Sequence, residues 1–306
     1  MKRLVKIYIL LFLVMLMWGM NLPALKVLVD TVDPVLLTSF RVFTAGVAVL
    51  VICYFMGIFR LPHKSEWLVM LYIGTFNVVL HHSFIAVGLE GTTGVNGALI
   101  LGLMPLMTVL MAVIFLRQKV NLLRTIGFIF GFAGVATTTL AGSGGVGAMS
   151  MGDVFVFLGV AVQGFSFVLI SKLRATFDPR LITGYIMVFG SVVIFGLSQA
   201  LGADVGEMAR VFDWHIGSVF LFSAIMATAF GHMTYNYVIK KVGPAESAIF
   251  INLNTLFAII GSAVFLNEAI MLEHIVGFVL IIVGIFLGTG AIEYLLKRRR
   301  GKVVER

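Results

Sequence analysis

The stretch Gly94–Gly134, GVNGALILGLMPLMTVLMAVIFLRQKVNLLRTIGFIFGFAG, decides the fold of this chain because it occurs twice. It consists of two apolar segments joined by a short basic turn, and a similar stretch, Pro244–Gly284, lies 150 residues further along. The matching positions are Ala98 and Ala248, Leu106 and Leu256, Phe115-Leu116 and Phe265-Leu266, Leu122 and Leu272, Gly127-Phe128 and Gly277-Phe278, and Gly134 and Gly284. Self-similarity at a fixed shift predicts that the chain is a tandem duplication.

The match extends upstream into the rest of each half. His82 matches His232 at the same shift, and Asp33-Pro34 matches Asp178-Pro179 at a shift of 145 residues. An insertion in the polar connection Gly202–Asp213 would account for the difference of five residues. We therefore expect two copies of one structural unit. The expected divisions are 1–142 for the first copy, 143–151 for a linker, 152–297 for the second copy and 298–306 for a basic tail.

The composition is that of a membrane protein. Of the 306 residues, 60% are hydrophobic and 12% are charged, and the mean hydropathy is +1.09. Soluble domains carry about 25% charged residues. The formal net charge of +8 does not indicate nucleic-acid binding, because most basic residues lie just outside apolar segments instead of clustering on a soluble face. The single cysteine, Cys53, excludes an internal disulfide.

Ten segments are long and apolar enough to cross a bilayer, which requires about 20 residues in a helix. They are separated by short connections, and each half of the chain contains five of them. The expected spans are Val5–Leu25, Val35–Met56, Trp67–Leu89, Val95–Leu116, Leu122–Ala141, Gly152–Ser171, Leu181–Leu201, Ile216–Ile239, Ala245–Leu266 and Ile275–Leu296.

Lysine and arginine set the expected orientation, because they are enriched in cytoplasmic connections. With the N-terminus in the cytoplasm, 19 of the 22 basic residues fall on the cytoplasmic side. Only Lys26 and Arg210 lie outside, and Arg41 lies within a span. Because five spans carry the first half across the membrane, the second half enters from the opposite side. The expected fold is therefore an all-α integral membrane protein with ten transmembrane helices, arranged as two inverted five-helix repeats with both termini cytoplasmic.

Three stretches are distinctive: Trp18-Gly19-Met20-Asn21 in the first span, Pro34 to Arg41 at the start of the second, and Phe265-Leu266-Asn267-Glu268 followed by Gly277 and Gly284. Together with the five-plus-five inverted repeats, they resemble the EamA-type members of the drug/metabolite transporter superfamily. In that family each half commonly ends its fourth helix with an apolar-Gly-Glu turn, and this chain keeps Glu268 but has Gln118 in the first copy. The resemblance implies transport, chiefly export, of small organic metabolites.

Polar side chains inside lipid are costly, so those within the spans are candidates for a binding site. Trp18 and Asn21 are three residues apart and share one helical face. Their repeat copies are Gln163 and Ser166, which again share a face. Two matched polar faces predict opposite walls of one cavity, and the alternative is that these groups form hydrogen bonds between helices.

The third and eighth spans carry further polar faces. Asn77 and His81 are four residues apart, with His82 adjacent. The eighth span holds the longest polar stripe, formed by Thr228, His232, Tyr235 and Asn236. Histidine titrates near neutral pH, so the matched His82 and His232 are candidates either for coupling transport to protons or for structural hydrogen bonds. No acid lies near the centre of any span, which argues against a carboxylate relay.

The ninth span has two polar faces, and the sequence leaves open which of them lines a path. One face carries Asn252, Thr255 and Ser262, and the other carries Ser247, Asn254 and Gly261. Asn252 is included in the candidate site. Arg41 lies about 10 Å inside the outer end of its helix, where it binds either a substrate carboxylate or a structural partner. Pro105 is expected to ease bending of the fourth span.

No motif indicates catalysis. The chain lacks a P-loop, a His-Glu-x-x-His motif, a Gly-x-Ser-x-Gly motif and a cysteine cluster, so we expect no enzymatic activity, metal or cofactor. We expect a multi-pass protein of the inner or plasma membrane that exports small organic solutes, such as amino acids or amphipathic toxic compounds, by alternating access. Lipid is an expected partner and the proton a candidate coupling ion. The alternatives are a membrane-embedded transferase acting on lipid-linked substrates and a channel or scaffold without coupled transport.

Overall fold

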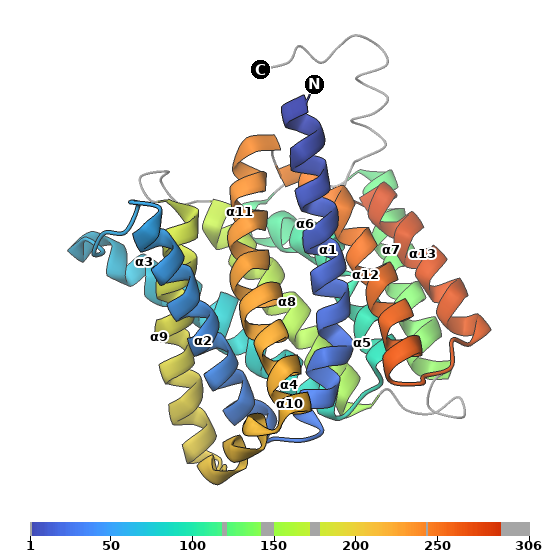
Figure 1. Cartoon of the computed structure of the whole chain (residues 1–306). Helices are drawn as coiled ribbons and strands as arrows, with labels where there is room; N and C mark the ends of the chain where they lie inside the picture. Colours follow the sequence, from blue (N-terminus) through green and yellow to red (C-terminus); the bar gives the residue numbers. More distant parts are fainter. Residues whose placement is uncertain (1, 118–120, 142–149, 172–177, 243, 289–306) are drawn as a thin grey trace.

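The computed structural model of the chain describes residues 2–117, 121–141, 150–171, 178–242 and 244–288. All regular structure in these residues is helical (Figure 1). The elements are α1 (Lys2–Val29), α2 (Pro34–Phe55), α3 (Lys64–Gly74), η1 (Thr75–Leu80), α4 (His81–Glu90), α5 (Gly94–Leu101), α6 (Met104–Leu116), α7 (Leu122–Ala141), α8 (Met151–Ser171), α9 (Pro179–Ala200), η2 (Val205–Phe212), α10 (Trp214–Leu221), η3 (Phe222–Phe230), α11 (Gly231–Val242), α12 (Pro244–Phe265) and α13 (Leu272–Gly288).

As far as the residues are described, each of the ten segments expected from the sequence falls on a helix or on a run of consecutive helices, and the tenth is described only to Gly288. Within the described residues, six continuous helical segments are long and apolar enough to cross a membrane, and the bent pair α5–α6 would make a seventh. The remaining apolar helices, in α7, α12 and α13, are shorter. The all-helical membrane fold is therefore confirmed. Most of the expected linker 143–151, namely residues 143–149, and the basic tail lie outside the described residues.

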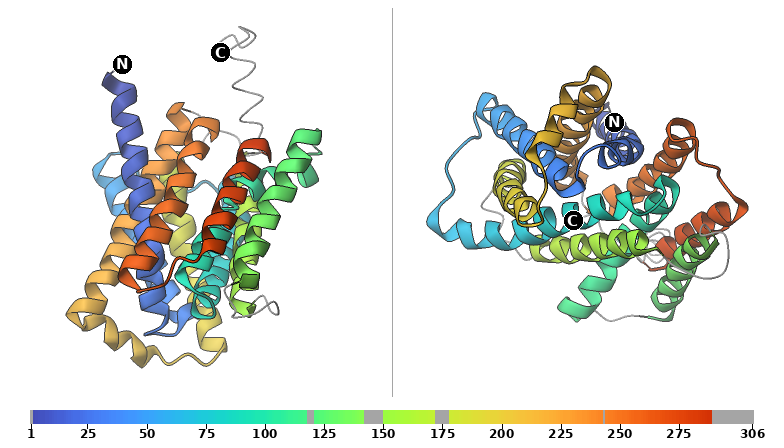
Figure 2. Two further views of the ribbon diagram at one scale, coloured as in Figure 1. Left: turned by 90° about the vertical axis from the view of Figure 1, so that its right-hand side faces the viewer. Right: turned by 90° about the horizontal axis from the view of Figure 1, so that it is seen from below.

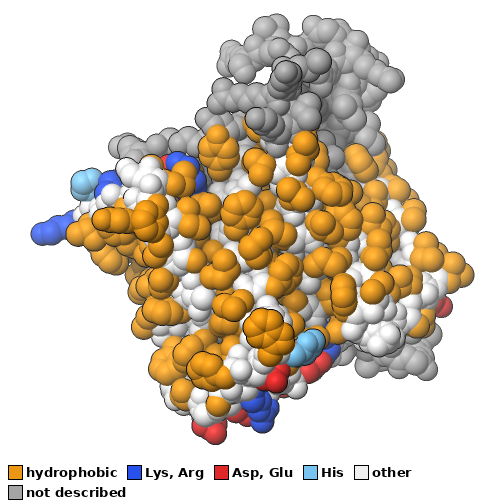
Figure 3. All heavy atoms as spheres, in the orientation of Figure 1, with side chains coloured by type: hydrophobic (Ala, Val, Ile, Leu, Met, Phe, Trp, Pro, Cys, Tyr) orange, Lys and Arg blue, Asp and Glu red, His pale blue; other side chains and the backbone are white. Residues whose placement is uncertain are grey.

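The outer surface suits a lipid environment. Figure 3 shows hydrophobic side chains over the middle of one face, with charged side chains at its lower end and at the upper left. Phe43, Val47 and Val51 of α2 are exposed and follow one another at helical spacing. Soluble monomers rarely expose large contiguous apolar patches, so this surface agrees with helices that are apolar enough to cross a membrane.

The last helices of the two halves, α7 and α13, pack side by side (Figure 2). Their contact is formed by a set of glycines, here called the glycine seam: Gly127, Gly131 and Gly134 of α7 with Gly277, Gly284 and Gly288 of α13. A Cβ atom on Gly134 would lie 2.7 Å from the carbonyl oxygen of Gly277, and one on Gly284 would lie 2.8 Å from that of Gly127. This close approach requires glycine. The order of the contacts shows that the two helices run antiparallel.

The first helix of each half packs on the fourth helical segment of the other half. Gly19 of α1 lies against α12, where an added Cβ would be 3.0 Å from the backbone nitrogen of Ala258. Gly164 of α8 matches Gly19 in the sequence repeat and lies against α6, where the corresponding distance to Thr108 is 3.1 Å. Ala258 and Thr108 are themselves 150 residues apart. The contact between Gly19 and Ala258 therefore has an equivalent between Gly164 and Thr108, with the roles of the two halves exchanged.

The repeated Asp-Pro pairs begin helices at equivalent places. The Asp33 carboxylate accepts the backbone N–H of Leu36 at 2.7 Å, and the Asp178 carboxylate accepts that of Arg180 at 3.0 Å. In each case a proline occupies the first helical turn. Aspartate before the helix and proline in its first turn both favour helix initiation, so α2 and α9 start in the same way.

Three segments depart from a straight α-helix. The break between α5 and α6 bends the chain by 40°, and Pro105 lies in the first turn of α6, where the sequence predicts bending. The segments η1 and η3 are π-helical, and they lie at matching places in the two halves. Each directly precedes a histidine-bearing helix, α4 or α11. π-Helical turns within α-helices occur frequently at functional sites.

Candidate functional site

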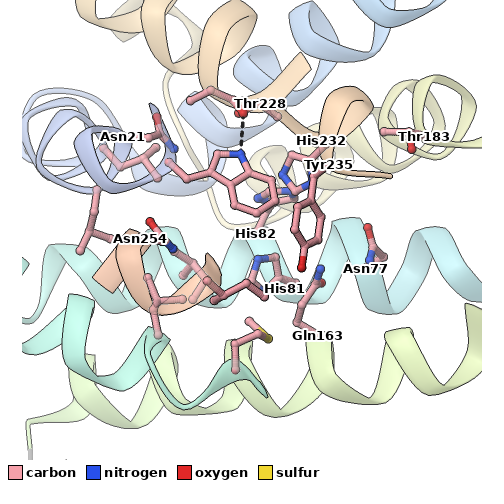
Figure 4. A pocket seen from close by; sticks show the side chains of 18 of the residues that line it. Asn21, Asn77, His81, His82, Gln163, Thr183, Thr228, His232, Tyr235 and Asn254 are labelled. Carbon is pink, nitrogen blue, oxygen red and sulfur yellow. Dashed lines mark hydrogen bonds between the residues drawn. The ribbon is translucent and has the colours of Figure 1, made fainter. Parts of the chain in front are cut away.

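A cavity of about 230 Å³ lies among helices from both halves of the chain (Figure 4). The first half contributes residues from α1, α2, α3, η1, α4, α5 and α6. The second half contributes residues from α8, α9, η3, α11 and α12. No described residue of the glycine seam lines the cavity.

Most of the polar residues expected at the site surround this cavity. Those that line it are Trp18, Asn21, Asn77, His81, Gln163, Thr228, His232 and Tyr235. Arg41 and His82, expected as coupling or structural groups, line it as well. Ser166 does not line it, and its hydroxyl donates to the carbonyl oxygen of Gln163 at 2.8 Å. The side chains of Asn236 and Asn252 lie outside the described part of the structure.

One wall of the cavity is aromatic. The indole N–H of Trp18 donates to the carbonyl oxygen of Ala227 at 2.8 Å, which ties α1 to η3. The Trp18 ring lies 4.9 Å from the His232 ring and 5.0 Å from the Tyr235 ring, measured between centroids. Tryptophan and tyrosine combine a large apolar face with a polar edge, so this wall can contact both apolar and polar parts of a solute.

The opposite wall is formed by hydrogen-bonding groups of η1, α4 and α8. The side-chain amide of Asn77 donates to the Ser166 hydroxyl at 2.9 Å. Nδ1 of His81 lies 2.9 Å from the carbonyl oxygen of Gly159, and because a carbonyl only accepts, this nitrogen carries a proton. Asn77, His81 and Gln163 all line the cavity (Figure 4). The Asn77 and Ser166 side chains thus link two helices while Asn77 also faces the cavity.

Arg41 of α2 is a fully buried cation, with 2% of its surface exposed. Its Nη1 donates to the Thr228 hydroxyl at 2.8 Å, and its Nη2 lies 3.4 Å from Nδ1 of His82. The Thr228 hydroxyl donates in turn to the carbonyl oxygen of Ser223, five residues earlier, at 2.7 Å. In an α-helix such a hydroxyl reaches the carbonyl four residues earlier. The π-helical geometry of η3 therefore sets the position from which Thr228 meets Arg41.

Sequence reasoning did not place three further polar residues at the site: Thr183 of α9 and Asn254 and Thr255 of α12. Thr183 lies 145 residues after Thr38, and this match within the repeat is the sequence feature that could have drawn attention to Thr183. Asn254 and Thr255 come from the two polar faces of the ninth segment, so each face contributes one residue. Further along α12, Ser262 is buried beside Gly94 and does not line the cavity.

The lining determines which chemistry the cavity can perform. It contains hydrogen-bonding groups and a guanidinium, but no described carboxylate or thiol. Across the described residues, no group of three or more His, Cys, Asp or Glu side chains could hold a metal ion. Apolar side chains such as Leu22, Ile85 and Phe167 form much of the remaining wall. Concave sites that are mostly apolar with a few polar groups bind small molecules.

Known proteins are similar in sequence to this chain along most of its length. The sequence model of the EamA-like transporter family matches residues 5–140 and 150–289. The chain is 27% identical to the uncharacterized transporter YyaM of Bacillus subtilis (strain 168), over 94% of this chain and 94% of that protein. It is 23% identical to an uncharacterized transporter of Archaeoglobus fulgidus, over 92% of this chain and 98% of that protein.

Two further similarities are more distant. The WAT1-related protein At3g02690, chloroplastic, of Arabidopsis thaliana is 22% identical over 88% of this chain and 66% of its own length. A protein of known crystal structure, 20% identical, superposes with a TM-score of 0.62 over 97% of this chain and 99% of that one, which shows the fold alone. With the family match over nearly the whole chain and helices that can span a membrane, this chain belongs to the EamA-like transporter family and is a multi-pass membrane transporter.

Proposed function

We propose that this protein is a secondary transporter that exports small organic metabolites, such as amino acids or amphipathic toxic compounds, by alternating access. The observation that carries the proposal is the cavity, which combines apolar and polar groups and lies between helices of the two matched halves. Transporters built from inverted repeats hold their substrates between the repeats and open by rocking one repeat against the other. In this mechanism the glycine seam keeps the halves together while the cavity walls move.

We further propose that all ten segments cross the membrane and that the halves, 1–142 and 152–297, are inverted copies joined by the linker 143–151. The antiparallel packing of α7 and α13 supports the inversion, because copies related by an axis in the membrane plane run in opposite directions. The beginning of α1 and the end of α13 lie on the same side of the bundle (Figure 1). An even number of crossings requires this arrangement. The distribution of basic residues, including the tail 298–306, supports a cytoplasmic location for that side.

Protons are the proposed candidate for coupling, and the contacts favour His232 over His82 as the carrier. A guanidinium only donates hydrogen bonds, so Nδ1 of His82 must accept from Arg41 without a proton of its own. A proton on that nitrogen would replace the hydrogen bond with repulsion between two cations. His232 lines the same cavity and packs against the Trp18 ring, and the hydrogen bonds that Arg41 forms with Thr228 and His82 do not involve it.

The test uses purified protein in proteoliposomes loaded with labelled amino acids and small aromatic cations. Efflux is recorded with and without an imposed pH gradient. We expect saturable efflux, and we expect His232→Ala to lower its initial rate by about tenfold, equivalent to about 1.4 kcal/mol, because the change removes a ring that packs on Trp18. His215→Ala is the matched control, since it alters an exposed histidine at the start of α10.

Three outcomes would change this assignment. Efflux that rises linearly with solute concentration would indicate a channel instead of a transporter that alternates. Efflux that is indifferent to the pH gradient would remove the proton from the proposal. Equal rates in His232→Ala and wild type, with both proteins monodisperse, would remove His232 from the solute path.

A further inference from the structure

Arg41 places an uncompensated positive charge at the cavity. Its two hydrogen-bond partners are a hydroxyl and an imidazole, from Thr228 and His82, and among the described residues it forms no ion pair. Ionisable groups within the membrane are costly and usually pair with a partner. The cavity lining supplies no described Asp or Glu that could be this partner. An anion that enters the cavity would complete the pairing.

The guanidinium has donors left for such an anion. Arginine has five N–H groups, and the contacts with Thr228 and His82 use one on Nη1 and one on Nη2. Its Nε is buried without a described partner. Two adjacent N–H groups of a guanidinium match the two oxygens of a carboxylate in short, charge-assisted hydrogen bonds. Arg41 can therefore keep its present contacts and bind a carboxylate as well.

The rest of the cavity restricts the chemistry of the solute. One described cation matches a single negative charge, which favours a monocarboxylate over a doubly charged phosphate. Trp18 and Tyr235 on one side, and apolar groups such as Ile85 on another, provide surface for an apolar body. A simple amine would bring a second positive charge close to Arg41, and the described lining has no carboxylate to pair with it.

We propose that the solute carried by this transporter has a carboxylate that binds Arg41 and an apolar body that lies against Trp18 and Tyr235. The inference rests on the proposed transport function and narrows its substrates to carboxylates, excluding simple cations. Plain organic acids and amino acids present the same two oxygens to Arg41. The side-chain oxygens of Asn21 and Gln163, both buried without a described partner, are acceptors in the cavity lining that are available to an amino group.

The test measures equilibrium binding to the full-length protein in detergent by titration calorimetry. Four compounds share one phenyl body: hydrocinnamate, phenylalanine, hydrocinnamamide and phenylpropylamine. We expect hydrocinnamate or phenylalanine to bind wild type about 10–100-fold more tightly than the amide, the range that charge-assisted hydrogen bonds provide. The amine should not bind. Preference for phenylalanine would assign the carboxylate to amino acids, and preference for hydrocinnamate to plain acids.

Variants connect this selectivity to Arg41. Arg41→Gln should remove the preference for carboxylate over amide, and Arg41→Lys should restore part of it, because lysine keeps the charge but not the paired donors. Arg124→Gln is the matched control. It makes the same chemical change at the start of α7, outside the cavity, at an arginine whose Nε is likewise buried without a described partner.

Several results would overturn the proposal. They are equal affinity of wild type for hydrocinnamate and its amide, failure of both carboxylates to bind, or retained selectivity in folded Arg41→Gln. The wild-type comparison needs no variant, so it decides the matter even where Arg41→Gln does not fold. Counterflow in proteoliposomes from the same preparation reports on transport separately, so the carboxylate assignment can fail while the transport function holds.

Discussion

The glycine seam and the cavity walls differ in how closely the two copies of the repeat agree. In the seam, two matched pairs consist of glycine on both sides, Gly127 with Gly277 and Gly134 with Gly284. In the cavity, His82 and His232 match, but Trp18 in the first half corresponds to Gln163 in the second. A close approach of two backbones tolerates only glycine on either side, whereas a solute is not symmetric and needs two unlike walls.

Arg41 is the sharpest case of this divergence. At the shift of 145 residues that relates the second helices, Arg41 corresponds to Ile186, and both residues line the cavity. A symmetric copy would have placed two cations at one small cavity, where they would repel each other. With a cation at one matched position and an apolar side chain at the other, the lining carries its charge on one half of the chain only.

The largest effect is expected in the seam. Gly284→Ala would place a Cβ 2.8 Å from the carbonyl oxygen of Gly127, and because backbone cannot rotate away as a side chain can, we expect a loss of at least about 1–3 kcal/mol in the free energy of unfolding. Gly196→Ala is the control, since nothing lies within 4 Å of its added Cβ. Thermal unfolding in detergent measures both, and similar midpoints would show that the seam can separate without cost.

An intermediate effect, on transport, is expected when Trp18 is replaced by glutamine, the residue at the matched position Gln163. Trp18→Gln removes the hydrogen bond to Ala227 and the ring contact with Tyr235, so we expect transport to fall by about tenfold or more with a smaller loss of stability than in Gly284→Ala. Trp214→Gln is the control, because Trp214 is 89% exposed. Initial rates in proteoliposomes measure the difference. Unchanged transport in Trp18→Gln would mean that the walls need not differ.

The smallest effect on stability is expected at Glu268. It lies in a turn outside the cavity, and its counterpart in the first copy of the repeat is Gln118. The Glu268 carboxylate accepts the backbone N–H groups of Gly94 and Val95, both at 2.7 Å, at the start of α5. A negative charge at a helix N-terminus contributes about 0.3–2 kcal/mol. Glu268→Gln should therefore lower the midpoint of thermal unfolding slightly. Glu90→Gln is the control, because Glu90 is exposed at the end of α4. Equal midpoints in these two variants would show that the charge contributes nothing beyond what a neutral amide supplies.

The helices and part of the site could be predicted from the sequence because both depend on local composition. Apolar segments of sufficient length locate the helices, and the repeat aligns them. Trp18, Asn21 and Gln163 could be recognised because a polar group in an apolar helix must face either a cavity or a partner. The family, predicted from short motifs, is confirmed by the match over both halves.

The contacts between helices could not be predicted. Thr228 lies 187 residues from Arg41 in the chain, and no local pattern reveals that they meet. Ser166 shares a face with Gln163 but does not line the cavity, because its hydroxyl bonds to the backbone of its own helix and to Asn77. Neither hydropathy nor the repeat predicts π-helical turns, since these depend on how the backbone hydrogen bonds are distributed within an otherwise helical run.

The two π-helical segments occupy matching places in the repeat. η1 covers Thr75–Leu80, and η3 contains the positions that follow 150 residues later. A π-helical turn holds more residues than an α-helical turn without interrupting the helix, and such turns are frequent at functional sites. The widened turn that presents Thr228 to Arg41 therefore has a counterpart in η1, the segment that carries Asn77.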